Sequence, residues 1–123
     1  MIPKFRAWDS VKKEMFKDTF AITEIGQVVV VEQKFVTSSP DYVFVDHLVI
    51  MQSTGLKDKN DKEIFEGDVV KCNGLLGTIE SFKAMWICSF VKYNNYQKVG
   101  FFAQEIDVVG NIYENPELLE DLK

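Results

Sequence analysis

Several kinds of residue are scarce in this chain of 123 residues, and each scarcity removes a class of protein. Arg6 is the only arginine and His47 the only histidine, so a hydrolase or nuclease has little material for a base and a nucleophile. Cys72 and Cys88 are the only cysteines. Each stands in a strand-like run, where we expect a small buried thiol rather than a disulfide.

Long apolar runs are missing as well. No run approaches the roughly 20 residues that a membrane span needs. The first nine residues include Lys4, Arg6 and Asp9 and therefore lack the continuous apolar core of a secretory signal. We expect a cytoplasmic protein without membrane association.

The composition is that of an ordinary globular protein, with 46% hydrophobic and 27% charged residues. The net charge is -5, but acidic residues near the C-terminus account for much of it, and residues 1–113 contain 15 acids and 13 bases. A general phosphate-attracting field is therefore absent. Any nucleic-acid site would have to be local.

Strand-like segments dominate the chain, because Val, Ile, Phe, Tyr and Trp recur in short runs between turn residues. The expected strands are Lys4–Trp8, Gln27–Val36, Tyr42–Met51, Asp68–Cys72, Gly77–Phe82, Met85–Val91, Val99–Ala103 and Ile106–Tyr113. Ser10–Phe16 fits either a helical turn or a hairpin leading into a strand. The turn residues between the runs predict a mainly β fold with antiparallel strands.

One short helix is expected at the C-terminal end. Asn115 can cap it, Pro116 suits its first position, and Glu117 favours the positive end of the helix dipole. A helix of about two turns is unstable alone in water, so its apolar face should dock on a sheet. That face would consist of Leu118, Leu119 and Leu122.

A polar stretch, residues 55–62, is the natural place to divide the chain. We expect a β-rich half over residues 1–53 and a second half over residues 54–123, unless the two form one continuous domain. The run 66–70 followed by Gly77, Thr78 and Ile79 is typical of the opening of a small barrel of Src homology 3 type, in which a glycine in the second strand permits a bend.

Three blocks of sequence carry a resemblance to a known family. They are Lys4–Asp9, with the sequence KFRAWD, the longer block Met51–Lys71, and Gly110–Glu120, with the sequence GNIYENPELLE. Together they resemble the YopX family of phage and prophage proteins. The resemblance implies the same kind of barrel and a location in a bacterial host cell. Because the family has no assigned reaction, it implies no catalytic residue and no cofactor.

The resemblance has one visible departure. Family members usually have glycine where this chain has Asp61, after the asparagine of a polar turn. Aspartate tolerates a left-handed backbone less well than glycine, although better than most residues. The type of turn at Asp58–Asp61 therefore stays open.

The spacing of the candidate catalytic and metal-binding residues does not fit a catalytic or a metal-binding site. Asp46 and His47 are neighbours on an expected strand and would point to opposite faces, so Asp46 is badly placed to orient the imidazole ring. The acidic run Asp58–Glu63 lacks the glycine and the final glutamate of a calcium loop, and we expect a solvated hairpin turn. Glu66 and Asp68 flank Gly67, where turn-forming roles are favoured over a pair of carboxylates.

The segment Ser81–Gln104 stands out because it contains three lysines and seven aromatic residues but no acid. Single-stranded nucleic acid binds to such surfaces, since bases stack on aromatic rings and phosphates need cations. The alternative is that the rings fill the interior of the barrel. The candidate binding patch consists of Lys83, Trp86, Lys92, Tyr93, Tyr96 and Lys98.

Three hypotheses for function follow. The first is a non-enzymatic phage accessory protein that binds another phage or host protein, or itself, through an exposed strand edge or an aromatic patch. Strands rich in valine, such as Val28–Val31, favour a homo-oligomer. The second is binding of single-stranded nucleic acid, and the third, ranked last, is a small hydrolase or nuclease.

Overall fold

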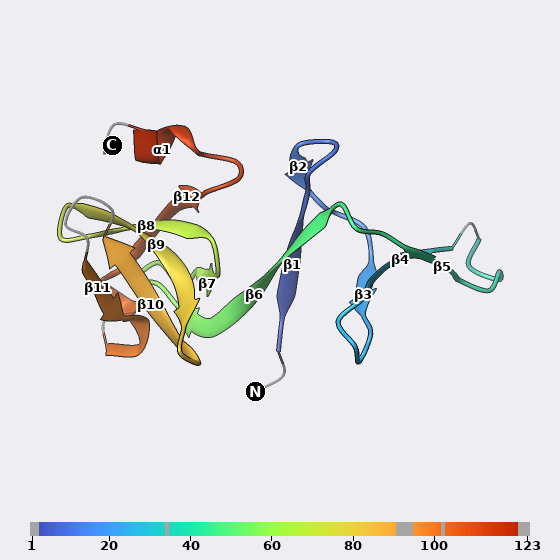
Figure 1. Cartoon of the computed structure of the whole chain (residues 1–123), viewed down its shortest axis with the longest axis horizontal. Coiled ribbons are helices and arrows are strands. Elements are labelled where there is room, and N and C mark those ends of the chain that lie inside the picture. Colours follow the sequence, from blue (N-terminus) through green and yellow to red (C-terminus); the bar gives the residue numbers. More distant parts are fainter. Residues whose placement is uncertain (1–2, 34, 91–94, 102, 121–123) are drawn as a thin grey trace. The chain divides into compact units, whose positions relative to one another are not determined.

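The computed structural model describes residues 3–33, 35–90, 95–101 and 103–120 (Figure 1). The chain divides into two compact units. Residues 7–50 form the N-terminal unit, whereas residues 1–6 and 51–123 form the C-terminal unit. The boundary that we expected between residues 53 and 54 lies close to the observed boundary between residues 50 and 51.

The secondary structure is almost entirely β. The first six strands are β1 (Phe5–Asp9), β2 (Glu14–Met15), β3 (Phe20–Ile22), β4 (Val28–Glu32), β5 (Asp41–Phe44) and β6 (Leu48–Lys57). They are followed by β7 (Glu63–Phe65), β8 (Asp68–Cys72), β9 (Leu75–Phe82), β10 (Met85–Phe90), β11 (Asn95–Lys98) and β12 (Asp107–Asn111). Two 3₁₀ turns, η1 (Val99–Phe101) and η2 (Ala103–Glu105), precede β12, and the helix α1 (Glu117–Glu120) follows it.

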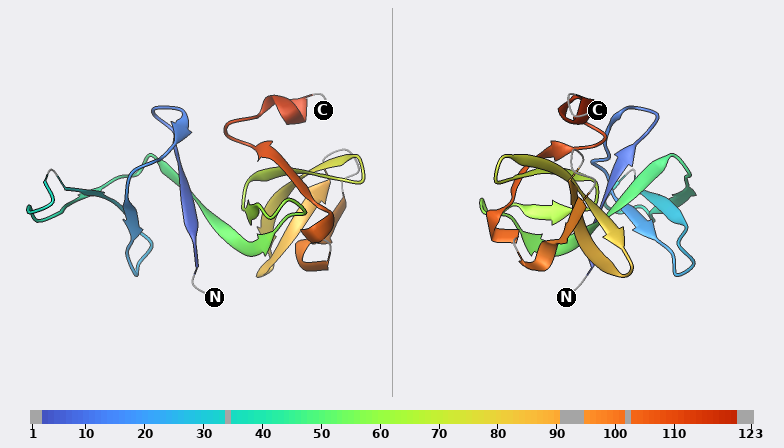
Figure 2. Two further views of the ribbon diagram at one scale, coloured as in Figure 1. Left: turned by 180° about the vertical axis from the view of Figure 1, so that it is seen from behind. Right: turned by 60° about the vertical axis from the view of Figure 1, so that its left-hand side comes forward.

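Within the described residues the strands pair into three antiparallel sheets, with the orders β2-β1-β6-β7, β11-β10-β9-β8-β12 and β3-β4-β5. The mainly β, antiparallel fold with a short C-terminal helix is thus confirmed. The five-stranded sheet curves into a half barrel (Figure 2). The finer prediction, a barrel of Src homology 3 type, stays a prediction.

The hydrophobic core belongs to the C-terminal unit, because strands β7, β8, β9, β10 and β12 turn one apolar face inward. It consists of Ile64, Val70, Cys72, Ile79, Cys88, Phe90, Val99, Ala103, Ile106 and Val108. Gly77 of β9 makes this packing possible because a larger residue would not fit at this position. A Cβ atom there would lie 2.5 Å from the Cys88 sulfur and 2.9 Å from the Ser89 carbonyl oxygen.

Several strand predictions were wrong in detail, and the strand expected over Gln27–Val36 ends at Glu32. Val99–Ala103 was expected as a strand but forms parts of η1 and η2. Val99 and Ala103 are both buried in the core. Tyr42–Met51 is interrupted at Asp46 and His47, so that it contributes to both β5 and β6.

Residues 10–16 form the hairpin rather than the helical turn, since β1 pairs with β2 through Trp8 opposite Met15. At the other end of the chain, α1 is present where a helix was expected, and Leu118 and Leu119 are half-buried. Leu122 lies outside the described residues. None of the helices in the described part of the chain has the length and the apolar character that crossing a membrane requires.

Candidate functional site

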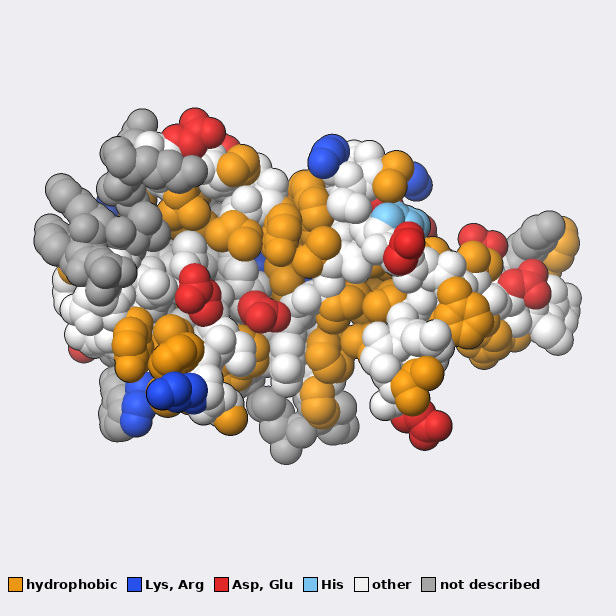
Figure 3. All heavy atoms as spheres, in the orientation of Figure 1, with side chains coloured by type: hydrophobic (Ala, Val, Ile, Leu, Met, Phe, Trp, Pro, Cys, Tyr) orange, Lys and Arg blue, Asp and Glu red, His pale blue; other side chains and the backbone are white. Residues whose placement is uncertain are grey.

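Strand β5 is an open edge of the sheet β3-β4-β5, and all four of its residues are exposed. Tyr42, Val43 and Phe44 are 62%, 44% and 66% exposed. Figure 3 shows hydrophobic side chains gathered over β4 and β5. An edge strand combines such side chains with free backbone donors and acceptors, which is the arrangement that binds a strand of another chain.

The rest of the N-terminal unit is also poorly covered. Its buried apolar residues, within the described range, are Ala7, Trp8, Val29 and Leu48. Large apolar side chains that remain exposed outside β5 are Val11, Ile25, Phe35 and Val36. In the valine run that suggested association, Val29 is buried and its neighbours are half-buried, so the more exposed surface is β5.

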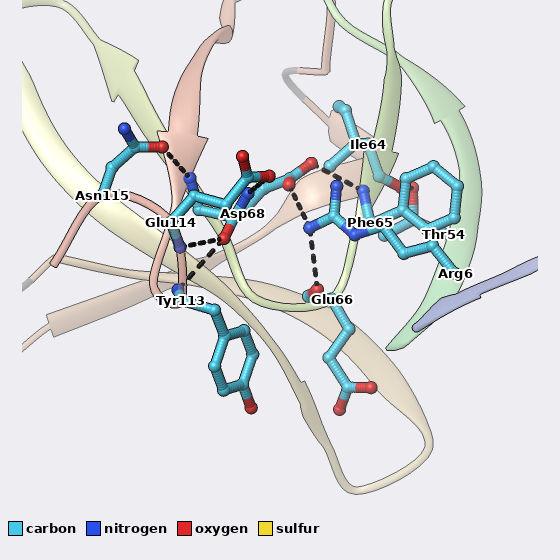
Figure 4. Close-up of polar contacts among 10 residues, drawn as sticks. Arg6, Thr54, Ile64, Phe65, Glu66, Asp68, Tyr113, Glu114 and Asn115 are labelled. Carbon is cyan, nitrogen blue, oxygen red and sulfur yellow. Dashed lines mark hydrogen bonds and ion pairs between the residues drawn. The ribbon is translucent and has the colours of Figure 1, made fainter. Parts of the chain in front are cut away.

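A second feature is a polar junction in the C-terminal unit, where Arg6 binds Asp68 (Figure 4). Asn111 is its third member, because it lies opposite Asp68 in the pairing of β12 with β8. The Arg6 guanidinium donates a hydrogen bond of 2.5 Å to Oδ1 of Asp68, and its carbon lies 4.6 Å from the centre of the Phe65 ring. The Phe65 N–H donates to Asp68 Oδ2 at 2.8 Å. Both carboxylate oxygens of Asp68 are therefore engaged.

Burial raises the pKa of Asp68, although the positive charge of Arg6 and the N–H of Phe65 both favour the carboxylate. The neighbouring Gly67 has a φ of +85° and its N–H donates to the Ile79 carbonyl oxygen. This left-handed conformation suits glycine and turns the chain from β7 into β8. The turn-forming role expected for this position is confirmed.

Asn111 joins the third block of sequence to the junction, since it lies opposite Asp68 in the pairing of β12 with β8. Its Oδ1 accepts hydrogen bonds from the N–H groups of Tyr113 and Glu114 at 3.0 and 2.8 Å. Oδ1 of Asn115 accepts from the Asn111 N–H at 3.2 Å. The Asn115 side chain thus closes this turn, while its carbonyl oxygen accepts the Leu118 N–H at the start of α1.

Part of the binding patch that was predicted in the segment Ser81–Gln104 is exposed. Phe82 and Tyr96 are 40% and 49% exposed, and their ring centres lie 5.6 Å apart. The ammonium group of Lys83 lies 5.3 Å from the centre of the Phe82 ring. Aromatic faces and a cation therefore share one exposed area of the C-terminal unit.

The remaining members of the predicted patch have different positions. Trp86 is half-buried against the core. Lys98 is exposed at the end of β11, opposite Ile87 of β10. Lys92 and Tyr93 lie outside the described residues.

Comparison with known proteins gives the family. The family model described as YopX protein matches residues 4–120. The chain belongs to the YopX family. Among curated proteins none matches the sequence significantly.

Two solved structures are similar to this YopX-family chain over nearly its whole length. Protein EF1440 from Enterococcus faecalis is 30% identical with a TM-score of 0.66, and the match covers 98% of this chain and 99% of that one. Protein yopX from Bacillus subtilis is 19% identical with a TM-score of 0.66, covering 94% and 97%. The three blocks that carried the resemblance meet at the polar junction, so in this YopX-family chain they serve the architecture.

The single histidine has a partner that sequence spacing did not suggest. Nε2 of His47 lies 3.9 Å from Oδ2 of Asp9, and the Ser10 hydroxyl donates to the carbonyl oxygen of His47 at 2.7 Å. The hydroxyl therefore contacts the backbone and not the imidazole ring. Asp9 also accepts the N–H groups of Val11 and Lys12, both at 3.0 Å, and these bonds close the β1–β2 turn. His47 is half-buried.

The acidic turn between β6 and β7 is a turn, as predicted, but its first residue is not solvated. Asp58 is 2% exposed and accepts hydrogen bonds from the N–H groups of Asn60, Lys62 and Val108 at 2.8, 2.9 and 3.0 Å. Asp61 has a φ of +64°, a left-handed conformation that glycine adopts more easily than aspartate.

The two cysteines are buried and free, as expected. Burial raises the pKa of Cys88 to about 12, so this thiol stays protonated. In the parts of the chain that the structure describes, no three His, Cys, Asp or Glu side chains lie close enough together to hold a metal ion.

Sequence reasoning missed the ion pair of Arg6 with Asp68 and the burial of Asp9 and Asp58. A signal for the first existed, since a lone arginine inside an apolar strand needs a carboxylate partner.

Proposed function

We propose that this YopX-family protein is a non-enzymatic phage or prophage accessory protein that acts by protein–protein contact through the edge strand β5. One observation carries the proposal. Tyr42, Val43 and Phe44 are all exposed on an edge strand. Natural proteins usually protect such edges with lysine, proline or a covering segment, and an apolar edge left open serves the addition of a strand from another chain.

The uneven burial of apolar residues supports the same proposal. The ten residues of the core cluster all belong to the C-terminal unit, which is therefore supplied with its own core. The N-terminal unit exposes large apolar side chains on β5 and in its loops. Exposed apolar surface of this kind marks interaction sites in soluble proteins.

The buried carboxylates support a non-enzymatic role, because their oxygens serve the architecture. Asp68 binds Arg6 and the Phe65 N–H, Asp58 binds three backbone N–H groups, and Asp9 binds two. Catalytic carboxylates instead face a cavity where a substrate can reach them.

Site-specific photo-crosslinking in bacterial cells tests the contact surface. A benzophenone amino acid replaces Phe44 in one protein and Val11, an exposed residue of the β1–β2 turn, in a matched control. Illumination should give discrete crosslinked products, either with another protein or with a second copy, from position 44 and not from position 11. Adding Tyr42→Lys to the position 44 protein should abolish these products. Equal products from both positions, or none from position 44, would contradict the proposal.

A second candidate function, binding of single-stranded nucleic acid, is favoured by the exposed pair Phe82 and Tyr96 with Lys83 beside it. Base stacking supplies roughly 1–3 kcal/mol per base, and few lysines give a shallow salt dependence. Fluorescence anisotropy with labelled oligonucleotides at low salt measures it. Tyr96→Ala should weaken binding, whereas Tyr42→Ala, which removes an exposed ring of the other unit, should not. Absence of binding by the folded wild type would remove this candidate.

A further inference from the structure

The hydrogen-bonding pattern of β5 limits what can pair with it. β5 is antiparallel to β4, with Val43 opposite Val30, and the Val45 N–H donates to the Val28 carbonyl oxygen at 3.1 Å. Backbone groups point alternately to the two sides of a strand. Val43 and Val45 therefore direct their N–H and C=O groups toward β4, and Tyr42 and Phe44 direct theirs toward the open edge.

A second copy of β5 meets this requirement in a narrow set of registers. Antiparallel strands form hydrogen-bonded pairs only between residues that both point toward the partner. With Val43 opposite Val43, Tyr42 faces Phe44 of the second copy and Phe44 faces Tyr42, so all four outward residues form bonds. Shifting the strands so that Phe44 faces Pro40 loses a donor, because proline has no N–H.

The same register also matches the side chains. Tyr42 and Phe44 lie on one face of the strand, so each aromatic ring meets the ring across from it, a favourable cross-strand pair. Asp41 is the only charged residue of β5, and it would lie opposite Val45 of the second copy. The two carboxylates are thus kept apart at opposite ends of the contact.

We infer that β5 pairs antiparallel with β5 of a second copy of this chain, about a twofold axis at Val43. The result is a continuous sheet in the order β3-β4-β5-β5-β4-β3. Such a contact is isologous, since the same residues serve on both sides, and it removes the open edge from both copies. The inference rests on the proposed function and names the partner.

Disulfide trapping tests the register. Val43 forms a non-hydrogen-bonded pair with itself, where Cα atoms lie about 4.5 Å apart, within the range of a disulfide. Under mild oxidation Val43→Cys should therefore give a covalent dimer that a reductant dissociates. The native Cys72 and Cys88 are buried, and the wild type serves as the background control.

Two further variants act as matched controls. Tyr42→Cys and Phe44→Cys each place identical thiols one residue to either side of the axis, so the two thiols are offset by two residues and their Cα atoms lie roughly 8 Å apart. Each alone should crosslink at least tenfold more slowly than Val43→Cys. An equal mixture of the two should crosslink faster than either one, because Tyr42 faces Phe44 in the inferred register.

Three results would overturn the inference. These are crosslinking of Val43→Cys no faster than that of the two controls, no gain in the mixture, or a monomeric wild type by light scattering at tens of micromolar. The proposed function is tested separately. If position 44 crosslinks to a different protein in cells while Val43→Cys stays monomeric, the β5 edge is a contact surface and the self-pairing is wrong.

Discussion

The two units place the same kinds of apolar residue in different environments. In the C-terminal unit, Val69 and Val70 of β8 are fully buried beneath neighbouring strands. In the N-terminal unit, Val43 of β5 is 44% exposed at an open edge. Valine favours strands in both places, but only burial converts it into stability. The comparison separates a unit with a buried apolar core from one whose apolar side chains are exposed on an edge strand.

The largest expected effect comes from the core. Ile79→Ala should lower the free energy of unfolding of the C-terminal unit by about 2–5 kcal/mol, because the side chain is 1% exposed and the cavity cannot collapse fully. Ile25→Ala, at a 75% exposed position of the N-terminal unit, should change it by less than about 0.5 kcal/mol.

Tryptophan fluorescence during urea unfolding can follow the two units separately. Trp86 packs against the core of the C-terminal unit, and Trp8 is buried in the N-terminal unit. In a Trp8→Phe background, Ile79→Ala should shift the transition that Trp86 reports. Equal losses of unfolding free energy for Ile79→Ala and Ile25→Ala would contradict the difference between the units.

The buried turn residue gives the next effect. Asp58→Ala leaves the buried N–H of Val108 without its acceptor and frees those of Asn60 and Lys62, so we expect a loss of roughly 2–3 kcal/mol. Asp58→Asn keeps one acceptor oxygen and should lose less. Lys59→Ala, next to it on the exposed side of the turn, is the control.

The same residue should leave a signature in the pH dependence. Burial by itself raises the pKa of Asp58, but the N–H groups of Val108, Lys62 and Asn60 outweigh it and lower the pKa below its ordinary 3.8. The contribution of the carboxylate is therefore present above that value and is lost as the pH falls through the lowered pKa. Urea unfolding at a series of acidic pH values should show this loss in the wild type and less of it in Asp58→Asn.

A matched pair of substitutions compares the two strands directly. Val70→Thr places a hydroxyl in the core and should cost about 1–3 kcal/mol, whereas Val43→Thr should change the stability of the isolated chain by less than about 0.5 kcal/mol. Thermal unfolding of dilute protein measures both. A costly Val43→Thr in a monomer would mean that β5 contributes to folding and is not reserved for contact.

The smallest effect is a gain. Asp61→Gly should stabilise the protein by at most about 1 kcal/mol, because glycine adopts a φ of +64° without the penalty of a Cβ atom. The exposed pair of Lys57 with Asp61, at 3.6 Å, contributes little in water. Asp61→Ala removes the same charge but keeps the Cβ atom, and it should not stabilise. A clear loss with glycine would show that the Asp61 side chain is needed.

The local sequence pattern was enough to predict much of the fold. β8 was predicted with its observed bounds, Asp68–Cys72, and β10 to within one residue, because runs of β-branched and aromatic residues are bounded there by turn residues. It failed at Val99–Ala103, where apolar content alone cannot distinguish a strand from a helical turn. It also missed β11, whose four residues Asn95–Lys98 are exposed and mostly polar and are held in a strand by pairing with β10.

The features of the candidate site were likewise predictable from the sequence only in part. The sequence by itself determined the family, the antiparallel β character and the buried cysteines, because these depend on composition, short motifs and local periodicity. Only the tertiary structure decided that Arg6 binds Asp68, that Asp9 lies near His47, and that β5 is exposed while β8 is buried. Those outcomes depend on which strands become neighbours, and pairing between distant segments is set by the packing of the whole sheet.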